Sequence, residues 1–593
     1  MPTKLHLASI VAGSALAFAA PMLLPSQAQA CGGTFCDTGP TAMPVDQTGE
    51  NILFQIGPDS VEAHIQISID PETSAEQFAW VIPVEALPEF EVGSQLLFDN
   101  MLAGSVPRYG VNNSFDFCGE GGGDDEGAGD PSGDSGGTGD GDGDDSGQPP
   151  GPEVVFQDSV GAYEIAVLDG GTVEGVMQWL ADNGYQQDPN AAPIIEEYLN
   201  ENFLFVALKL GVSSGVEDVH PIVIKYAGTE PCVPIRLTAI AAAEDMDIRT
   251  FFLGNARTVP TNYRHVLVNP LKIDWFNNAS NYKEVISMAV DAQEADGNAF
   301  VTEYAGTSGV ISLAGVYDAS WNSASIAALV DSPVGLYQVL AGQNLMFCDI
   351  DWDQVCTTAH LLLQPLLDTY VPVPEGVDPV EFWDCMECFA DQIDLVAWDA
   401  LAFAEAFDER IVKPGQRAVD LVNANPYLTR MYTTISPHEM NADPMFRENP
   451  TLPEIDFLRM ASQTLHCDGS TTVELPDGRQ VYFPAGEPLT WPAFQDEMPW
   501  DEDIDQEGMA ANAPLVNLVD KTEEIDALLD EWNKNQGMSS DDEGGTGGEA
   551  GADDQLGGGG CACAVEDRSP LGGGLLGLAS LGLLGLLRRR RDD

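Results

Sequence analysis

Apolar and polar side chains alternate through residues 61–69, where Val61 and Ala63 are interleaved with Glu62 and His64. This period of two is typical of a β-strand that has one buried face and one exposed face. We therefore predict a half-buried strand over 61–69.

Further short apolar runs are separated by Gly, Pro, Asn and Asp, the residues that favour turns. They predict neighbouring strands at 51–56 and 78–84, followed by strands at 162–168, 203–210, 221–226 and 233–241. Helices are predicted where apolar residues recur at helical spacing, at 94–102, 173–182 and 193–201. This mixture indicates an α+β fold whose N-terminal domain is rich in strands with packed helices.

The second half of the chain has a different pattern. Apolar residues recur at helical spacing from Phe389 to Phe407, which predicts one amphipathic helix. Residues 473–475 and 480–483 flank Pro476-Asp477-Gly478, and this arrangement predicts a β-hairpin. We expect the region 306–536 to be mostly helical.

Two segments, 119–152 and 537–560, are rich in glycine and acidic residues and cannot bury a core. The first holds 14 Gly and 10 acidic residues and no aromatic residue, so we expect both segments to be disordered. The expected organisation has six parts: 1–30, a signal peptide; 31–118 with 153–305, an α+β domain; 119–152, an insertion; 306–536, the helical region; 537–560, a linker; and 561–593, a tail.

Several motifs in the first half resemble the bacterial domain-of-unknown-function family 2330. They are CGGTFC at 31–36, FAWVIPV at 78–84, GSQLLFDNML at 93–102, WLADNGYQ at 179–186, FVALKL at 205–210, PIRLTAIAA at 234–242 and VPTNYRHV at 259–266. The resemblance covers roughly residues 31–305. It implies no activity and no catalytic residue, because the family has none assigned.

The first 30 residues have the pattern of a secretory signal peptide. Lys4 precedes an apolar stretch, and Ala28-Gln29-Ala30 provides the small residues that precede a cleavage site. Cleavage after Ala30 would make Cys31 the first residue of the mature protein. We expect plain export, with lipidation of Cys31 as the alternative.

The C-terminal tail resembles the MYXO-CTERM sorting signal of myxobacterial surface proteins. It has Cys561 and Cys563, an uncharged stretch from Leu571 to Leu587, and then the basic residues Arg588, Arg589, Arg590 and Arg591. The uncharged stretch would span roughly 26 Å as a helix, slightly short for a bilayer. The resemblance implies cleavage by a membrane-embedded sorting protease and lipidation of one of the two cysteines. An ordinary tail anchor is the alternative.

The net charge is −71, from 95 acidic and 24 basic residues. The segments 1–30 and 561–593 contain six of the basic residues and only four of the acidic ones, so the mature protein is more acidic than the whole chain. Nucleic acid is therefore excluded as a partner, since it carries the same sign of charge. We interpret the acidity as adaptation to a saline habitat, with selection for solubility as the alternative.

Eleven cysteines occur, nine of them between residues 31 and 560. Disulfides are the default in an exported protein, and an odd number leaves one cysteine free, lipidated or bonded to another molecule. We expect the local pairs Cys31–Cys36 and Cys348–Cys356, and a structural disulfide at Cys385–Cys388. The CxxC spacing of the last pair leaves two alternatives: redox exchange, or zinc binding with His360, Cys348 or Cys356 as further ligands.

Catalytic and metal-binding motifs are missing from the sequence. No HExxH or G-x-S-x-G pattern occurs, and the alternating aspartates at 140–144, 349–353 and 501–505 lack the Gly and Glu that a calcium-binding EF-hand loop needs. We expect no catalytic residue, specific metal site or cofactor, and only weak divalent-cation binding by the acidic segments. We therefore predict an exported, surface-anchored protein with an envelope, adhesion or binding role, whose partners are the export machinery and the sorting protease. An extracellular hydrolase without a local motif is the alternative.

Overall fold

The computed structural model describes residues 47–69, 79–116, 151–185, 190–211, 219–240, 242–349, 355–508, 510 and 512–538. All of these residues belong to one compact unit. The predictions that concern Ala30, Cys31, Cys36, Cys561, Cys563, Leu571, Leu587 and Arg588–Arg591 lie outside the described residues. So do the expected insertion up to residue 150 and the linker from residue 539 onward.

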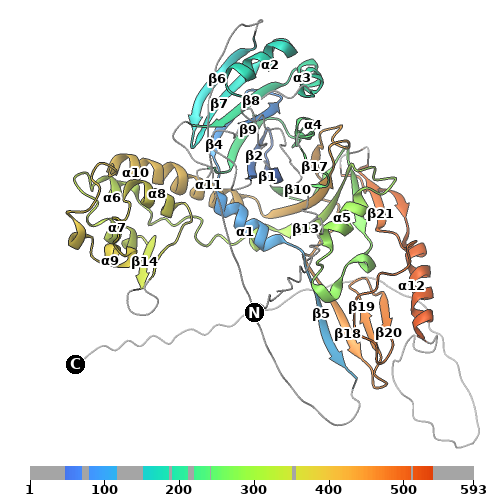
Figure 1. Ribbon diagram of the computed structural model, residues 1–593. Helices are drawn as coiled ribbons and strands as arrows, with labels where there is room; N and C mark the ends of the chain where they lie inside the picture. Colours follow the sequence, from blue (N-terminus) through green and yellow to red (C-terminus); the bar gives the residue numbers. More distant parts are fainter. Residues whose placement is uncertain are drawn as a thin grey trace, which may run out of the picture. The chain divides into compact units, whose positions relative to one another are not determined.

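A ten-stranded sheet forms the centre of the protein, and most of its neighbouring strands are antiparallel (Figure 1). Its strands, from one edge to the other, are β22 (Val516–Asp520), β21 (Asp501–Gln506), β12 (Arg264–Val268), β13 (Ala299–Thr307), β16 (Tyr427–Ile435), β10 (Met246–Gly254), β1 (Gln47–Ile56), β2 (Ser60–Ile69), β9 (Ile222–Ala227) and β4 (Glu89–Val92). The parallel pairs are β1 with β10 and β12 with β13.

Strand β2 is buried on both faces, so the expectation of one exposed face was wrong. Val61 and Ala63 belong to the core on one side, whereas His64 on the other side is only 1% exposed. Helices α1 (Gln95–Ser105) and α11 (Lys413–Ala424) contribute to a core on that second side, together with Leu53 of β1, which is directly opposite His64. Since α11 is more than 300 residues away in sequence, alternation along β2 alone could not reveal this cover.

A second sheet packs against the first and makes a β-sandwich. Its strand order is β3 (Ala79–Val84), β8 (Leu204–Leu210), β7 (Tyr163–Asp169) and β6 (Glu153–Val160). Side chains from both sheets form one shared core, and α2 (Val173–Asp182) and α3 (Ala191–Asn200) cover the outer face of the second sheet (Figure 1). The expectation that β3 is a neighbour of β1 and β2 is therefore wrong, because β3 belongs to the second sheet.

The strand predicted at 233–241 is also wrong. Residues Ile235–Thr238 form the short helix α4. Pro231 and Pro234 have no N–H group to donate to a strand ladder, and Ile235 N instead donates to Val233 O. The strongly apolar composition of this segment reflects burial of Ile235 and Leu237 in the core and not strand structure.

Further elements pack against the end of the central sheet that contains β12 and β21. Helix α5 (Tyr282–Val290) and helix α12 (Thr522–Gln536) share a core with a four-stranded sheet. The order of this sheet is β20 (Gln480–Phe483), β19 (Thr471–Glu474), β18 (Leu458–Leu465) and β5 (Arg108–Phe115). Strands β19 and β20 form the predicted hairpin, with Gly478 in the turn at φ +92°. A separate pair joins β11 (Thr258–Pro260) to β17 (Phe446–Glu448).

The helical part of the second half is a lobe inserted between two adjacent strands. Strands β13 and β16 pair up to Thr307 and Tyr427, and the chain between them leaves the sheet and returns to the same place. The lobe has its own core. Its elements are α6 (Ser323–Ala327), α7 (Leu336–Gly342), β14 (Met346–Asp349), β15 (Val355–Thr358), α8 (Leu363–Tyr370), α9 (Pro379–Asp384), α10 (Ala400–Phe407) and a π-helical turn (Asp408–Val412) that leads into α11.

Two predictions for this half need correction. The region 306–536 is helical mainly between residues 323 and 424, and strands β16–β22 follow over 427–520. The helix expected from Phe389 to Phe407 begins only at Ala400, where Asp399 Oδ1 accepts hydrogen bonds from Leu401 N and Ala402 N. Before that point Asp394 accepts from two other backbone N–H groups, and such side-chain bonds favour turns over a continuous helix.

Candidate functional site

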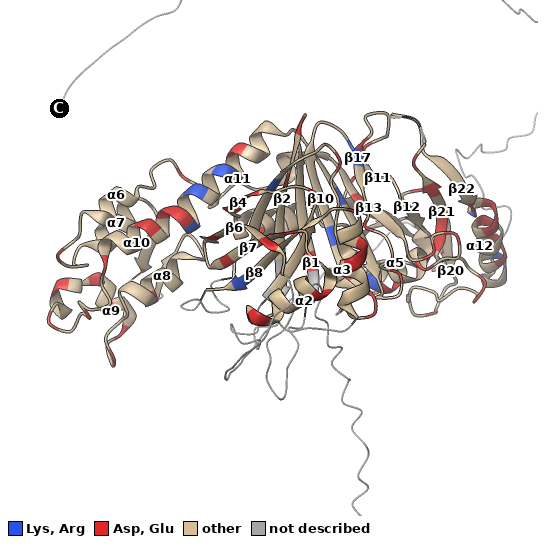
Figure 2. Ribbon diagram, turned by 90° about the horizontal axis from the view of Figure 1, so that it is seen from above, with Lys and Arg blue, Asp and Glu red and all other residues tan. Residues whose placement is uncertain are grey.

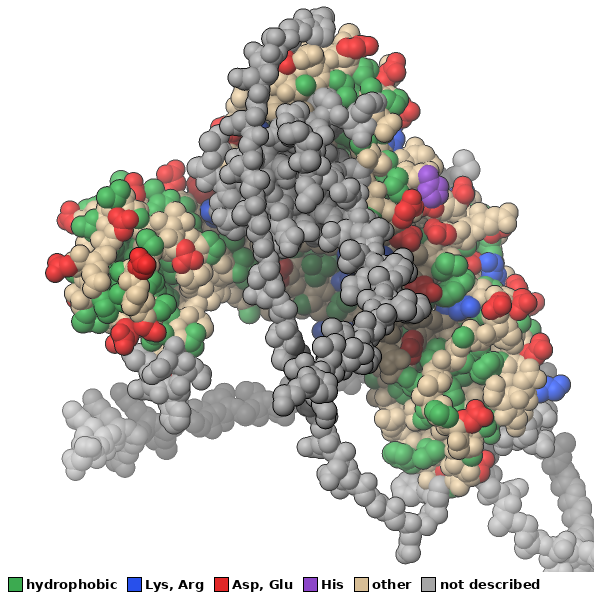
Figure 3. Space-filling view, in the orientation of Figure 1, with side chains coloured by type: hydrophobic (Ala, Val, Ile, Leu, Met, Phe, Trp, Pro, Cys, Tyr) green, Lys and Arg blue, Asp and Glu red, His purple; other side chains and the backbone are tan. Residues whose placement is uncertain are grey.

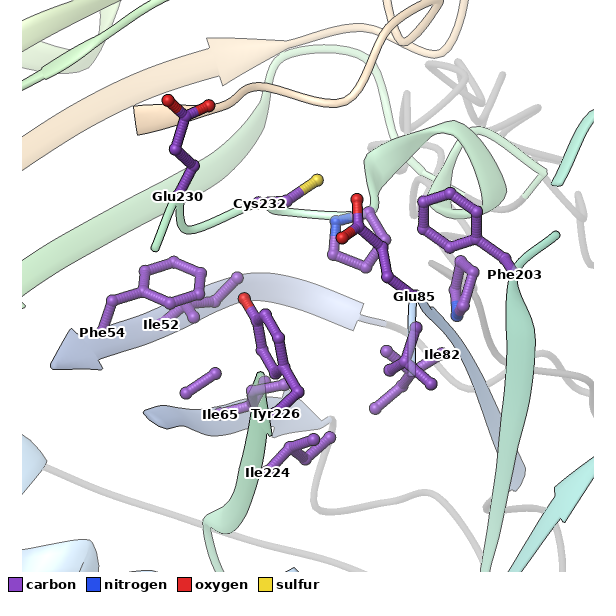
Figure 4. Close-up of a pocket in the computed structure, with 14 residues that line it drawn as sticks. Ile52, Phe54, Ile65, Ile82, Glu85, Phe203, Ile224, Tyr226, Glu230 and Cys232 are labelled. Atoms are coloured by element: carbon purple, nitrogen blue, oxygen red, sulfur yellow. The ribbon is translucent and has the colours of Figure 1, made fainter. Parts of the chain in front are cut away.

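The best-defined candidate site is a cavity between the two sheets of the sandwich (Figure 4). Strands β1, β2 and β9 line it from the central sheet, and β3 lines it from the second sheet. The apolar lining residues are Ile52, Phe54, Ala63, Ile65, Ile82, Pro83, Val84, Phe203, Ile224 and Pro234. They face one another because alternate residues of each strand point into the sandwich.

The cavity is small and its wall is almost entirely apolar. Its volume is about 50 Å³, enough for roughly three to five water-sized groups at ~10–15 Å³ each. A water molecule needs two to four polar partners to remain in a buried place. The aliphatic part of the wall offers none, so the space suits an apolar group better than water.

The polar groups of the site are Tyr226, Glu85, Glu230 and Cys232 (Figure 4). Glu85 and Glu230 are exposed, while Tyr226 and Cys232 are half-buried. The Tyr226 hydroxyl has a hydrogen bond with the backbone of Cys232, and burial raises the pKa of this phenol. Two carboxylates thus flank one side of an otherwise apolar space.

Cys232 is the one free cysteine among the described residues. Burial raises the pKa of its thiol well above the usual value, and the nearby carboxylates of Asp443 and Glu85 raise the pKa further. A nucleophilic cysteine needs the opposite environment, one that stabilises the thiolate. The thiol of Cys232 therefore stays protonated at neutral pH and is poorly suited to attack a substrate.

A buried polar network holds the loop that carries Cys232. Asp443 accepts hydrogen bonds from Arg236 N and Nε, both at 3.0 Å, and from the Tyr198 hydroxyl at 2.9 Å. Arg236 also pairs with Glu201 at 2.6 Å and lies 4.1 Å from the centroid of the Tyr198 ring. Burial raises the pKa of Asp443 even though Arg236 and Tyr198 oppose the shift. The network joins α3, α4 and the loop after β16 on one side of the cavity.

Two of the three expected disulfides are present, and both lie away from the cavity, in the helical lobe. Cys348–Cys356 joins opposite residues of β14 and β15, and Cys385–Cys388 follows α9. Cys467 is also in a disulfide. The sequence indicated one unpaired cysteine through the odd count, but nothing in the pattern identified it as Cys232.

The histidines and acidic clusters do not assemble a further centre in the described part of the chain. None of the six histidines in these ranges lines the cavity. No group of three or more His, Cys, Asp or Glu residues there is arranged to hold a metal ion. The aspartates at 501–505 lie on strand β21, where Asp501 pairs with Lys521 at 2.8 Å. No described helix is long and apolar enough to cross a bilayer.

The surface of the described ranges is strongly acidic. Acidic side chains are spread over the visible face in Figure 3, whereas basic ones are few. The excess of acidic residues is therefore visible on folded elements and is not confined to the glycine-rich segments.

Comparison with known proteins gives one match. A family described as uncharacterised protein conserved in bacteria (DUF2330) matches residues 25–328. This range includes every residue that lines the cavity and all four strands of the second sheet, and it ends just after α6; β16, β21 and β22 of the central sheet lie beyond it. No curated protein and no solved structure matches the chain.

Proposed function

The chain belongs to DUF2330, an uncharacterised bacterial family, and we propose that it is an exported, surface-anchored protein that binds an apolar group in the sandwich cavity. The observation that supports binding is the cavity itself, an apolar space of about 50 Å³ with Glu85 and Glu230 beside it. An apolar space with a few convergent polar groups is typical of ligand binding, and this one, far smaller than the roughly 300–1,000 Å³ of a site for a drug-sized ligand, would hold only a small group. The proposed role is non-catalytic.

The carboxylates define the chemistry of the ligand. Glu85 and Glu230 favour a ligand that carries a positive charge or a hydroxyl group next to its apolar end, and they disfavour a carboxylate. The volume accommodates a chain end of roughly three or four carbon atoms. We therefore expect a short alkyl group attached to an amine or alcohol.

An enzymatic role receives less support. A hydrolase without a local motif would need carboxylates and a histidine that converge in one pocket. The cavity has the carboxylates but no histidine from the described ranges, and its thiol is held in the protonated form. Binding is the function that this geometry supports best.

Export and anchoring rest on the two ends of the sequence. The signal-like segment 1–30 and the tail with Cys561, Cys563 and the arginine cluster have the order expected of a surface-sorted protein. The disulfides of the lobe agree with an oxidising compartment. Mass spectrometry of the protein released from the cell surface should find Cys31 as the first residue and a lipid on Cys561 or Cys563. A protein that retains Met1 or an unmodified C-terminus would contradict this proposal.

Calorimetry with three probes of equal chain length tests binding. We expect n-butylamine to bind best, n-butanol less well and butanoate least. Ala63→Val should abolish binding because it fills the cavity. Val61→Ile is the matched control, since it adds a methylene to the same strand and the same core outside the cavity lining. The proposal would be contradicted if the unmodified protein bound the three probes equally. It would also be contradicted if Ala63→Val bound the amine as well as Val61→Ile does.

A further inference from the structure

A second, larger groove lies between the sandwich and the helical lobe. Its volume is about 850 Å³, within the range of ligand-binding sites. One wall is formed by β4 and by the end of β6, the other by α8, α10 and α11 (Figure 2). The groove has no lining residue in common with the sandwich cavity.

The strand wall presents an open sheet edge. Among the described residues, β6 is the last strand of the second sheet and β7 is its one strand partner, while Ser159 N donates to Asp158 Oδ1 at 2.8 Å. Three consecutive residues at its end, Asp158–Val160, line the groove. Most of β6 is exposed, including the apolar residues Val154 and Val155. An exposed strand edge offers unpaired backbone groups to which another extended chain can add.

The helical wall presents one continuous face. Residues Glu405, Glu409, Lys413 and Arg417 recur every four residues through α10, the π-helical turn and α11, so they lie on one side of the helix. π-Helical turns are rare and frequently occur at functional sites.

Two carboxylates in the groove are available to form an ion pair with a bound cationic group. Lys413 pairs with Asp408 and Glu409, and Arg417 pairs with Glu62 and Glu91. Asp158 on the strand wall and Glu405 on the helical wall are exposed and have no ion pair with a cation in the described ranges. The two walls therefore each offer one carboxylate to a cationic group in the groove.

We propose that this groove binds an extended basic segment of a partner protein by strand addition to β6. The partner's backbone would pair with the edge of β6, where it would displace the Asp158 carboxylate from Ser159 N, and its basic side chains would pair with Asp158 and Glu405. Alternate side chains of an extended chain point in opposite directions, so one Lys or Arg can reach the strand wall and another the helical wall. The net charge of −71 would also accelerate the encounter with a basic partner.

A peptide of alternating Thr and Lys tests the proposal with the full mature protein. Its length should be about eight residues, to match β6. Titrations at about 0.15 M ionic strength reduce unspecific attraction to the acidic surface. Asp158→Asn with Glu405→Gln should weaken binding by roughly tenfold or more, because charge-assisted hydrogen bonds are lost. Asp169→Asn with Glu196→Gln is the matched control, since it removes the same charge from exposed positions outside the groove.

Three further arms distinguish strand addition from other kinds of binding. A backbone N-methylated peptide of the same charge should bind at least about tenfold more weakly. Amide hydrogen exchange of Glu153–Val160 should slow when the unmodified peptide binds. The corresponding Thr-Glu peptide should not bind. Equal losses in both double variants, undiminished binding of the N-methylated peptide, or binding of the Thr-Glu peptide would overturn the proposal.

Discussion

Asn533 on α12 forms two hydrogen bonds with the backbone of the edge strand β20. Its Oδ1 accepts from Tyr482 N at 2.9 Å, and its Nδ2 donates to Gln480 O at 2.7 Å. The side-chain amide thus occupies the place that another strand would take. Because these two backbone groups of the edge strand are bonded to the protein's own helix, β20 is protected from pairing with other chains.

Replacement of this amide should destabilise the protein. Asn533→Leu removes the side-chain partner of Tyr482 N and Gln480 O, whose bonds to Asn533 are partly buried, and we expect the free energy of unfolding to fall by about 0.5–1.5 kcal/mol for each lost hydrogen bond. Denaturant titration measures the change. Asn535→Leu is the control, because Asn535 is exposed on the same helix. Similar losses in both variants would mean that helix propensity, and not the edge contact, is responsible.

Acid should destabilise the protein through His265. Arg257 Nη2 donates to His265 Nε2 at 3.0 Å, so this nitrogen carries no proton. Burial, followed by the charge of Arg257, lowers the pKa of His265 to about 3 from 6.5. The unfolded chain therefore takes up this proton first as pH falls.

The contribution of His265 to stability is complete above pH 6.5 and is lost as the pH falls toward 3, by about 1.4 kcal/mol per pH unit. His265→Gln, which keeps an acceptor for Arg257, should flatten this dependence in unfolding titrations between those pH values. The exposed His438 provides the control, and His438→Gln should leave the slope unchanged. A slope that survives in His265→Gln would assign the effect to other groups.

Loss of a lobe disulfide should lower the local stability of the lobe while leaving that of the sheets unchanged. Cys348 and Cys356 close a loop of sequence separation 8, and the entropy model predicts a loss of about 2–3 kcal/mol when such a loop opens. In Cys348→Ala with Cys356→Ala, hydrogen exchange should accelerate through α6–α10 and remain slow in β13 and β16. Equal acceleration in the two strands would show that the lobe and the sheet unfold as one unit.

Salt should stabilise the folded protein. After removal of residues 1–30 and 561–593, 91 acidic and 18 basic residues remain, and dissolved ions screen the repulsion between them. The melting temperature should rise from low to molar NaCl. Sucrose, which is excluded from protein surfaces but carries no charge, separates screening from general stabilisation. A melting temperature that is indifferent to NaCl would contradict adaptation to a saline habitat.

Patterns local in sequence predicted much of the fold. The strands β1, β2, β7, β8 and β9, the helices α1, α2 and α3 and the hairpin β19–β20 lie close to where spacing and turn residues indicated. Each of these elements carries its signal within about ten residues. The mixed α+β character followed from the same signals.

Long-range contacts account for what the sequence could not reveal. His64 looked exposed because its cover comes from α1 and α11, and the segment after Val233 resembled a strand although its prolines prevent ladder bonds. The cavity also escaped prediction. Its walls come from strands in different sheets, and Asp443, whose carboxylate raises the pKa of Cys232, is more than 200 residues away from it.

The insertion of the lobe between β13 and β16 makes that position a natural site for protein engineering. The two chain ends that enter the lobe are anchored opposite each other at Thr307 and Tyr427, about 5 Å apart as in any strand pair. A foreign domain whose own termini are adjacent has the geometry to be grafted there. The sandwich could then serve as a display scaffold that carries such a passenger.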